Sequence, residues 1–265
     1  KGQTVTITVT PEDGYTLDTL TVTDKDGNKL PVTAVGGGKY TFTMPEGAVS
    51  IAASFKAASA EGWKLGYQNC PLDETCPLWP YTDVKSSDWY HDGVHFCMEN
   101  GLMNGYSDGS FKPAANTTRA MIATILYRLE GAPAVSGTAF SDVAAGAYYH
   151  DAVLWAQVNG VVKGYGDGTF GPDNAVTREQ MAAILHRYAQ YKGYDVSVGE
   201  NTNILSYGDA ERVEEYAIPA MQWACGAGVV TGKQGASGLN LDPKGSTTRA
   251  EMATMMMRFC AELVK

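Results

Sequence analysis

The sequence predicts an α+β multidomain protein, in which a small all-β module precedes a mainly α-helical region of helix–loop–helix repeats. Three observations indicate this fold class. Apolar and polar residues alternate with a period of two over residues 1–56, which is typical of half-buried strands. From residue 81 onward, apolar residues recur at helical spacing. Within that region the dipeptide Thr-Arg occurs at residues 118, 177 and 248, so the helical part is built from repeats.

The N-terminal module has its clearest alternating run at residues 4–10, and residues 20–23, 40–44 and 49–55 follow the same pattern. Asp26-Gly27-Asn28 and Gly36-Gly37-Gly38 mark turns, so we expect about five strands. Gly14-Tyr15 and the ending Tyr-Thr-Phe-Thr-Met-Pro-Glu-Gly make the module similar to the internalin B-repeat of bacterial surface proteins. The resemblance implies a spacer or stalk, with sugar binding as the alternative role.

Residues 57–80 have no clear periodicity and are interpreted as a linker. Cys70 and Cys76 enclose a short Pro-rich loop, which is compatible with a disulfide in an exported protein or with two free thiols in an anaerobe. The complete set of cysteines is odd in number, so one at least lacks a partner within the chain: Cys70, Cys76, Cys97, Cys225 and Cys260. No cysteine and histidine spacing is typical of zinc, so no metal site is predicted.

The helical region divides into repeats at residues 81–135, 136–200 and 201–265. Each repeat opens with an aspartate, followed six or seven residues later by an aromatic residue and then by a first helix. The first helices end at Gly101, Gly160 and Gly228, where glycine supplies a left-handed cap. A Gly-rich loop then leads to a second helix that begins at Thr-Arg. The third repeat carries an insertion in this loop.

The ordered motifs Phe-x-Asp-Val, Gly-Tyr-x-Asp-Gly-x-Phe-x-Pro and Thr-Arg-Ala-Glu make residues 81–262 resemble the surface-layer homology family. The resemblance implies that three repeats form one pseudo-threefold domain, in which the first helices meet in a central bundle. It also implies that grooves between adjacent repeats bind a secondary cell-wall polysaccharide linked to peptidoglycan. The typical ligand is a terminal pyruvylated N-acetylmannosamine.

The Thr-Arg positions suggest a carboxylate site on chemical grounds as well. Thr248 and Glu251, like Thr177 and Gln180, are spaced as capping boxes, which puts an arginine at the first helical position. A cation there opposes the helix dipole, whereas an anionic ligand would be bound by both the arginine and the free N–H groups. The alternative is that these arginines pair with an aspartate of the neighbouring repeat. The second repeat keeps all the motifs, so we expect Arg178 above all to bind the ligand. The first repeat has Met121 in place of the glutamate.

The candidate ligand-binding residues are Arg119, Arg178, Arg249, Asp83, Asp142, Asp209, Trp89, Tyr148, Tyr216, Gly105, Gly164 and Gly232. The aspartates have a second interpretation as N-caps of the first helix or as part of its entry turn, the aromatic residues as core, and the glycines as turn residues. The arginines nine residues further along, Arg128, Arg187 and Arg258, are interpreted as structural because they lie half a turn away on the helix.

Other chemistries are not predicted. His91 and His95 have the spacing of a zinc pair but lack the catalytic glutamate, so they are interpreted as surface histidines. Asp108 and Asp167 fit Asx or type I turns better than calcium loops. The net charge of −9 argues against nucleic acid, and no run is long enough to span a membrane. No signal peptide is present, and Lys1 begins directly on a strand pattern, so we interpret the chain as an internal fragment of a longer exported protein.

The sequence therefore predicts a non-enzymatic, cofactor-free wall anchor at the bacterial cell surface. Two alternatives remain open at this stage. The repeats could assemble a surface lattice through protein–protein contacts with the grooves unused, or the β-module could be the binding part and the repeats its base.

Overall fold

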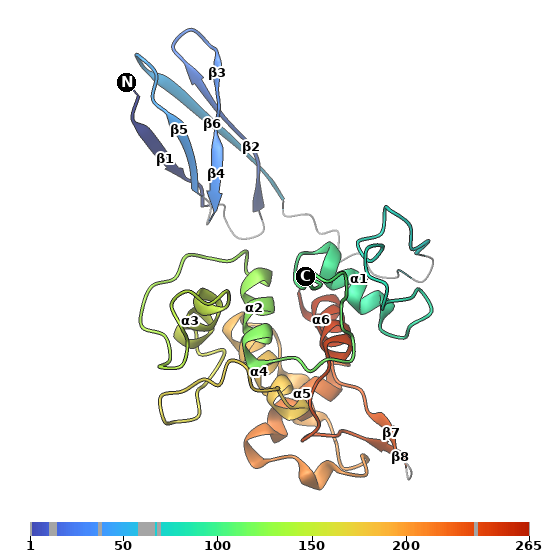
Figure 1. Ribbon diagram of the computed structural model, residues 1–265. Coiled ribbons are helices and arrows are strands. Elements are labelled where there is room, and N and C mark those ends of the chain that lie inside the picture. The colour runs from blue at the N-terminus through green and yellow to red at the C-terminus, as the bar shows by residue number, and fades with distance from the viewer. Residues whose placement is uncertain are drawn as a thin grey trace. The chain divides into compact units, whose positions relative to one another are not determined.

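The computed structural model describes residues 2–10, 15–36, 39–57, 67, 70–235 and 238–264. The chain divides into two compact units, a β unit within residues 1–62 and a helical unit formed by residues 63–130 and 135–265 (Figure 1). Lys1 and glycines 14, 37 and 38, which entered the sequence-based interpretation, lie outside the described residues.

The β unit contains two three-stranded antiparallel sheets, with strand orders β1-β5-β4 and β3-β2-β6. The strands are β1 (Thr4–Thr8), β2 (Tyr15–Asp24), β3 (Lys29–Leu30), β4 (Thr33–Gly36), β5 (Lys39–Thr43) and β6 (Val49–Ala57). The four alternating runs are confirmed as β1, β2, β5 and β6. The hairpin turn is confirmed by Gly27, which has φ +86° between β2 and β3. Strands β3 and β4 were missed because neither is long enough to establish a period.

Each repeat of the helical unit contributes a pair of α-helices (Figure 1). The pairs are α1 (His91–Glu99) and α2 (Arg119–Leu129), α3 (His150–Val158) and α4 (Arg178–Tyr191), and α5 (Ile218–Gly226) and α6 (Arg249–Leu263). A short 3-10 helix, η1 (Ser197–Asn201), lies at the junction of the second and third repeats. The third repeat adds two more, η2 (Ala210–Arg212) and η3 (Glu215–Ala217), and a hairpin of β7 (Lys233–Gly235) and β8 (Gly238–Asn240). Among the described residues, none of the helices has the length and apolar character needed to cross a bilayer.

The helix ends follow the predicted capping chemistry. Thr177 and Thr248 form complete capping boxes with Gln180 and Glu251, whereas Thr118 accepts only the backbone N–H of Met121. The glycines that follow the first helices all have φ between +66° and +70°, which confirms the left-handed caps at Gly101, Gly160 and Gly228. The turn interpretation is likewise confirmed for Asp108 and Asp167, each of which accepts the backbone N–H two residues ahead.

The three repeats interlock in a cyclic order. The second helix of each repeat packs against the first helix of the following one, in the pairs α2 with α3, α4 with α5, and α6 with α1. This differs from the expected bundle of first helices. Where the second helices begin, a ring of backbone hydrogen bonds runs from Thr117 N to Thr247 O, from Thr247 N to Val176 O and from Val176 N to Thr117 O, at 2.8, 2.9 and 2.9 Å. Residues far apart in the sequence are therefore joined at the start of every second helix.

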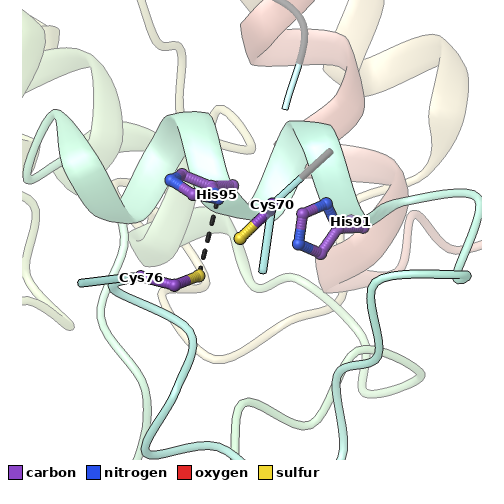
Figure 2. Close-up of side chains that lie close together, drawn as sticks. All are labelled: Cys70, Cys76, His91 and His95. Carbon is purple, nitrogen blue, oxygen red and sulfur yellow. Dashed lines mark hydrogen bonds between the residues drawn. The ribbon is translucent and has the colours of Figure 1, made fainter. Parts of the chain in front are cut away.

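The segment before the first repeat packs on α1. Cys70 and Cys76 are free thiols and lie beside His91 and His95 of that helix (Figure 2). The interpretation of these histidines as surface residues is wrong, because His91 is 1% exposed and His95 6% exposed. This contact could not be predicted from the spacing of cysteines and histidines, because the two cysteines lie in an aperiodic segment and only the fold brings them to the helix that carries the histidines.

Candidate ligand-binding grooves

The helix-start arginines bind the Gly-rich loop of the next repeat. Arg119 donates from Nε to the carbonyl of Phe170 at 2.7 Å and from Nη2 to the carbonyl of Lys163 at 2.8 Å. The same two bonds join Arg178 to Leu241 and Thr231, and Arg249 to Phe111 and Asn104. All three arginines are buried. They therefore connect the repeats, as the structural alternative expected, but through backbone carbonyls and not through the opening aspartates.

The opening aspartates hold the same loops from within their own repeat. The carboxylate of Asp142 accepts the backbone N–H groups of Phe170 and Gly171 at 2.8 and 2.7 Å. Asp83 holds Phe111 and Lys112 in this way, and Asp209 holds Leu241 and Asp242. Burial opposes ionisation, but the two N–H groups keep the pKa of Asp142 below its usual value. These aspartates do not cap the first helices, whose N-caps are Tyr90, Tyr149 and Ala217, but they lie in the turns that lead toward those helices.

The loop glycines are required by packing inside each repeat. A Cβ on Gly105 would lie 2.0 Å from the ring of Tyr81, and one on Gly164 would lie 2.4 Å from the carbonyl oxygen of Thr169. A Cβ on Gly232 would lie 2.7 Å from the ring of Tyr207. A glycine therefore lets each loop lie against its own repeat while its other side faces a groove.

Three grooves lie between the repeats, and we name each by its helix-start arginine. The Arg119 groove has a volume of about 240 Å³ and is lined by Arg119, Lys163, Gly164, Tyr165, Gln180, Arg187 and Tyr216, among others. The Arg178 groove, of about 330 Å³, is lined by Arg178, Gly232, Lys233, Glu251, Arg258 and Trp89. The Arg249 groove, of about 390 Å³, is lined by Arg249, Gly105, Tyr106, Met121, Arg128 and Tyr148. Every groove thus combines the arginine of one repeat, the loop glycine of the next and the aromatic residue of the third.

The aromatic residues stand at the groove edges with their rings exposed. Trp89, Tyr148 and Tyr216 are 67%, 69% and 53% exposed, so their interpretation as core residues is wrong. The opening aspartates, in contrast, line none of the three grooves. Of the predicted site residues, the structure therefore brings the arginines, glycines and aromatic residues together and leaves Asp83, Asp142 and Asp209 behind the loops.

The second arginines were missed as site residues. Each of them points away from the helix-start arginine of its own helix. Each instead lines the groove that contains the helix-start arginine of the preceding repeat, in the order Arg128, Arg187 and Arg258. Arg128 donates to the carbonyl of Leu102 and Arg258 to the hydroxyl of Thr231. Arg187 makes no such bond within the described part of the chain, and burial lowers its pKa. The regular spacing of nine residues from each helix-start arginine could have indicated these residues. Their place in a groove depends on the cyclic contact between repeats.

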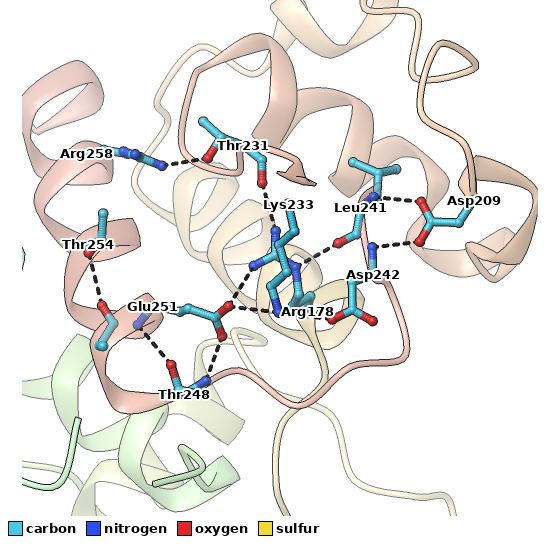
Figure 3. A network of polar contacts seen from close by, with 11 residues as sticks. Arg178, Asp209, Thr231, Lys233, Leu241, Asp242, Thr248, Glu251, Thr254 and Arg258 are labelled. Atoms are coloured by element: carbon cyan, nitrogen blue, oxygen red, sulfur yellow. Dashed lines mark hydrogen bonds and ion pairs between the residues drawn. The ribbon is translucent and has the colours of Figure 1, made fainter. Parts of the chain in front are cut away.

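The Arg119 and Arg178 grooves differ in charge. Arg119, Lys163 and Arg187 face the first of these without a lining carboxylate. In the second, Glu251 lies 2.8 Å from Lys233 Nζ and 3.6 Å from Arg178 Nη1, and Asp242 lies 2.9 Å from the same lysine (Figure 3). Arg178 and Lys233 are therefore paired with carboxylates of the protein, whereas Arg258, which also lines this groove, donates to the hydroxyl of Thr231.

The Arg119 groove also continues into a second depression of about 550 Å³. The two share Lys163, Ala183, Arg187 and Tyr216, and the second extends along α4 to Tyr191 and over the start of α5 at Pro219. Together they form a longer cleft whose cationic end is the Arg119 groove.

Comparison with known families gives two matches. The S-layer homology domain model matches residues 80–121, 139–182 and 206–253, and the divergent InlB B-repeat domain model matches residues 1–59. A surface-layer 125 kDa protein of Lysinibacillus sphaericus is 27% identical over 77% of this chain. An endoglucanase of Bacillus sp. is 30% identical over 67% of the chain, and a cellulosome-anchoring protein of Acetivibrio thermocellus is 30% identical over 47%. The chain spans only 17%, 18% and 29% of these three relatives.

Proposed function

Because the chain belongs to the S-layer homology domain family, we propose that it anchors an exported protein non-covalently to the bacterial cell wall. The chain is an extracellular module of the cell surface. We propose further that residues 81–135, 136–200 and 201–265 form one pseudo-threefold domain, an arrangement supported by the cyclic hydrogen bonds of its arginines. The proposed β-module covers residues 1–56 and acts as a spacer, and residues 57–80 connect the two.

The proposed ligand is a secondary cell-wall polysaccharide that carries pyruvylated N-acetylmannosamine. The observation that supports this most is the Arg119 groove, where three cations gather and Arg187 has no hydrogen-bond partner among the described residues. A pyruvyl ketal presents a carboxylate, which the planar guanidinium binds through two parallel hydrogen bonds. The exposed ring of Tyr216 at the same groove offers an apolar face for the sugar ring.

A polymer also suits the shape and charge of this region. The cleft that continues from the Arg119 groove along α4 gives room beyond one terminal sugar. The chain carries a net charge of −9, so attraction to an acidic polymer has to come from the local arginines and lysine. We therefore favour the Arg119 groove over the Arg178 groove, although the sequence pointed to Arg178.

The test is retention of the full chain on purified wall sacculi, before and after hydrofluoric acid removes the polymer. We expect retention to be lost on stripped sacculi. An Arg187→Gln variant should lose roughly ten- to a hundredfold in affinity, because a charge-assisted hydrogen bond contributes about 1.5–3 kcal/mol. Arg212→Gln is the matched control, since Arg212 is an exposed arginine that lines none of the grooves.

Two results would contradict the proposal. Equal retention on stripped sacculi would make peptidoglycan or a protein the partner. Full retention of Arg187→Gln on intact sacculi would move binding away from the Arg119 groove. The lattice alternative is tested in the same preparation, because it requires concentration-dependent oligomers in light scattering together with no retention on the wall.

A further inference from the structure

Four metal-ligating side chains converge at the start of the first repeat, away from the three grooves. Cys70 and Cys76 come from the segment before the repeat, and His91 and His95 lie one turn apart on α1. The four ligand atoms all lie within 4.8 Å of one another (Figure 2). A tetrahedral zinc ion with bonds of 2.0–2.3 Å needs ligand atoms about 3.3–3.8 Å apart. The Sγ of Cys76 and the Nδ1 of His95 are already 3.6 Å apart.

The orientation of His91 gives a second observation. Its Nδ1 lies 3.1 Å from a carboxylate oxygen of Asp92, while its Nε2 is buried and has no hydrogen-bond partner within the described residues. A buried ring nitrogen without a partner costs free energy, which a metal bond would recover. The carboxylate on the opposite nitrogen fixes the tautomer that leaves Nε2 as a ligand, as in carboxylate–histidine–zinc arrangements.

The surroundings of Cys76 and His95 fit the same chemistry. The backbone N–H of Leu78 is directed at the Sγ of Cys76 at 3.4 Å, a contact that would stabilise a thiolate. The ring of Tyr67 stacks on that of His95 with centroids 3.9 Å apart, which holds this imidazole in place.

The second repeat has an equivalent helix, α3, that lacks this cluster. His150 and Asp151 repeat the pairing of His91 with Asp92, at 2.8 Å. The position of His95, however, is occupied by Leu154, which is buried in the apolar core. The same helix therefore folds well with leucine at this site, and an imidazole is not needed for packing.

We propose that Cys70, Cys76, His91 and His95 form a structural zinc site that fixes the segment before the first repeat to α1. The site is independent of the proposed polymer binding. Four protein ligands leave no open position, so the role of the ion is structural. Zinc is bound by thiolates, so metal affinity falls as the pH is lowered.

The test is the metal content of the full chain, purified with reduced thiols in the presence of zinc and dialysed against metal-free buffer. We expect about one zinc ion per chain. Cobalt substitution should give the intense visible bands of a tetrahedral ion together with thiolate-to-cobalt charge transfer. His95→Leu should fold, as judged by circular dichroism, and lose the metal, because it installs the residue of the second repeat. His150→Gln is the matched control and should keep the metal.

Cys76→Ser provides an independent check, since it should remove most of the cobalt charge-transfer absorbance. The proposal is overturned by a reduced chain that takes up no zinc, or by a His95→Leu variant that retains zinc in full. It is also overturned by a native chain in which Cys70 and Cys76 form a disulfide and zinc is not taken up after reduction.

Discussion

The Arg119 and Arg178 grooves are built on the same scaffold but differ in how their cations are used. Both have a buried arginine that binds two carbonyls of the next repeat, a loop glycine and an exposed aromatic ring. In the Arg119 groove the facing residue on the second helix is Gln180, whereas in the Arg178 groove it is Glu251, which pairs with Lys233. Whether a groove has all its binding residues therefore depends on both repeats that form it, and not on one repeat alone. The second repeat keeps every motif, yet its arginine faces the divergent loop of the third.

The largest expected effect is a difference in stability between the alanine variants of Arg119 and Arg187. Arg119→Ala leaves the carbonyls of Phe170 and Lys163 without their donor, at about 1–3 kcal/mol for the buried bond to Phe170 and less for the part-buried bond to Lys163. We therefore expect the helical unit to lose about 3 kcal/mol. Arg187→Ala should change stability by only about 0.5 kcal/mol, because Arg187 is half-buried and loses no hydrogen bond within the described residues.

Urea denaturation followed by tryptophan fluorescence measures this difference. Every tryptophan of the chain lies outside residues 1–62, so the signal reports the helical unit. Arg119→Lys serves as a control, since it keeps the charge but not the planar pair of donors. Equal losses for the alanine variants of Arg119 and Arg187 would contradict the division into a structural and a binding arginine.

A smaller effect is expected from exchanging the acidic residue between the grooves. Glu251→Gln keeps a capping box of the kind that Thr177 and Gln180 form, but it releases Lys233 and Arg178 from the carboxylate. In an Arg187→Gln background we expect sacculus retention to rise roughly fivefold, which corresponds to about 1 kcal/mol of ion pairing made available to the ligand. Gln180→Glu in the unmodified chain should weaken retention. Unchanged retention in both variants would show that groove charge does not decide binding.

The smallest effect concerns the incomplete cap of the first repeat. Met121→Gln gives Thr118 the reciprocal partner that Thr177 and Thr248 already have. We expect a gain of about 0.5–1 kcal/mol in the free energy of unfolding, measured by the same urea titration. Met121→Leu is the control and should give no gain. A loss of stability in the glutamine variant would mean that Met121 contributes more by packing than a capping box can.

Local features were predictable from the sequence because they depend on neighbouring residues. Period-two alternation identified β1, β2, β5 and β6, and the Thr-x-x-Gln/Glu spacing identified the starts of α4 and α6. The strands β3 and β4 carry too few residues for a period to appear. The family resemblance supplied the idea of grooves between repeats.

The composition of each groove was not predictable, because it depends on which repeat follows which in space. Arg187 lies half a turn from Arg178 on its own helix, and only the cyclic contact brings it to Arg119. The same reason explains the cluster at α1. Cys70 and Cys76 lie in a segment without periodicity, and no local spacing rule connects them to His95. The opening aspartates were misjudged because their partners are backbone N–H groups, which carry no signature in the sequence.

The ring of backbone hydrogen bonds joining residues 117, 176 and 247 closes only when all three repeats are present. In a linear solenoid each repeat contacts only its neighbours, so a shortened array still folds. Here Thr117 has its partner in Thr247, near the end of the last repeat, so the contact closes a very long loop and is slow to form. Synthesis proceeds from the N-terminus, and a nascent chain therefore has no complete groove until the third repeat exists. Under the proposed function, wall binding therefore begins only after the third repeat has been synthesised.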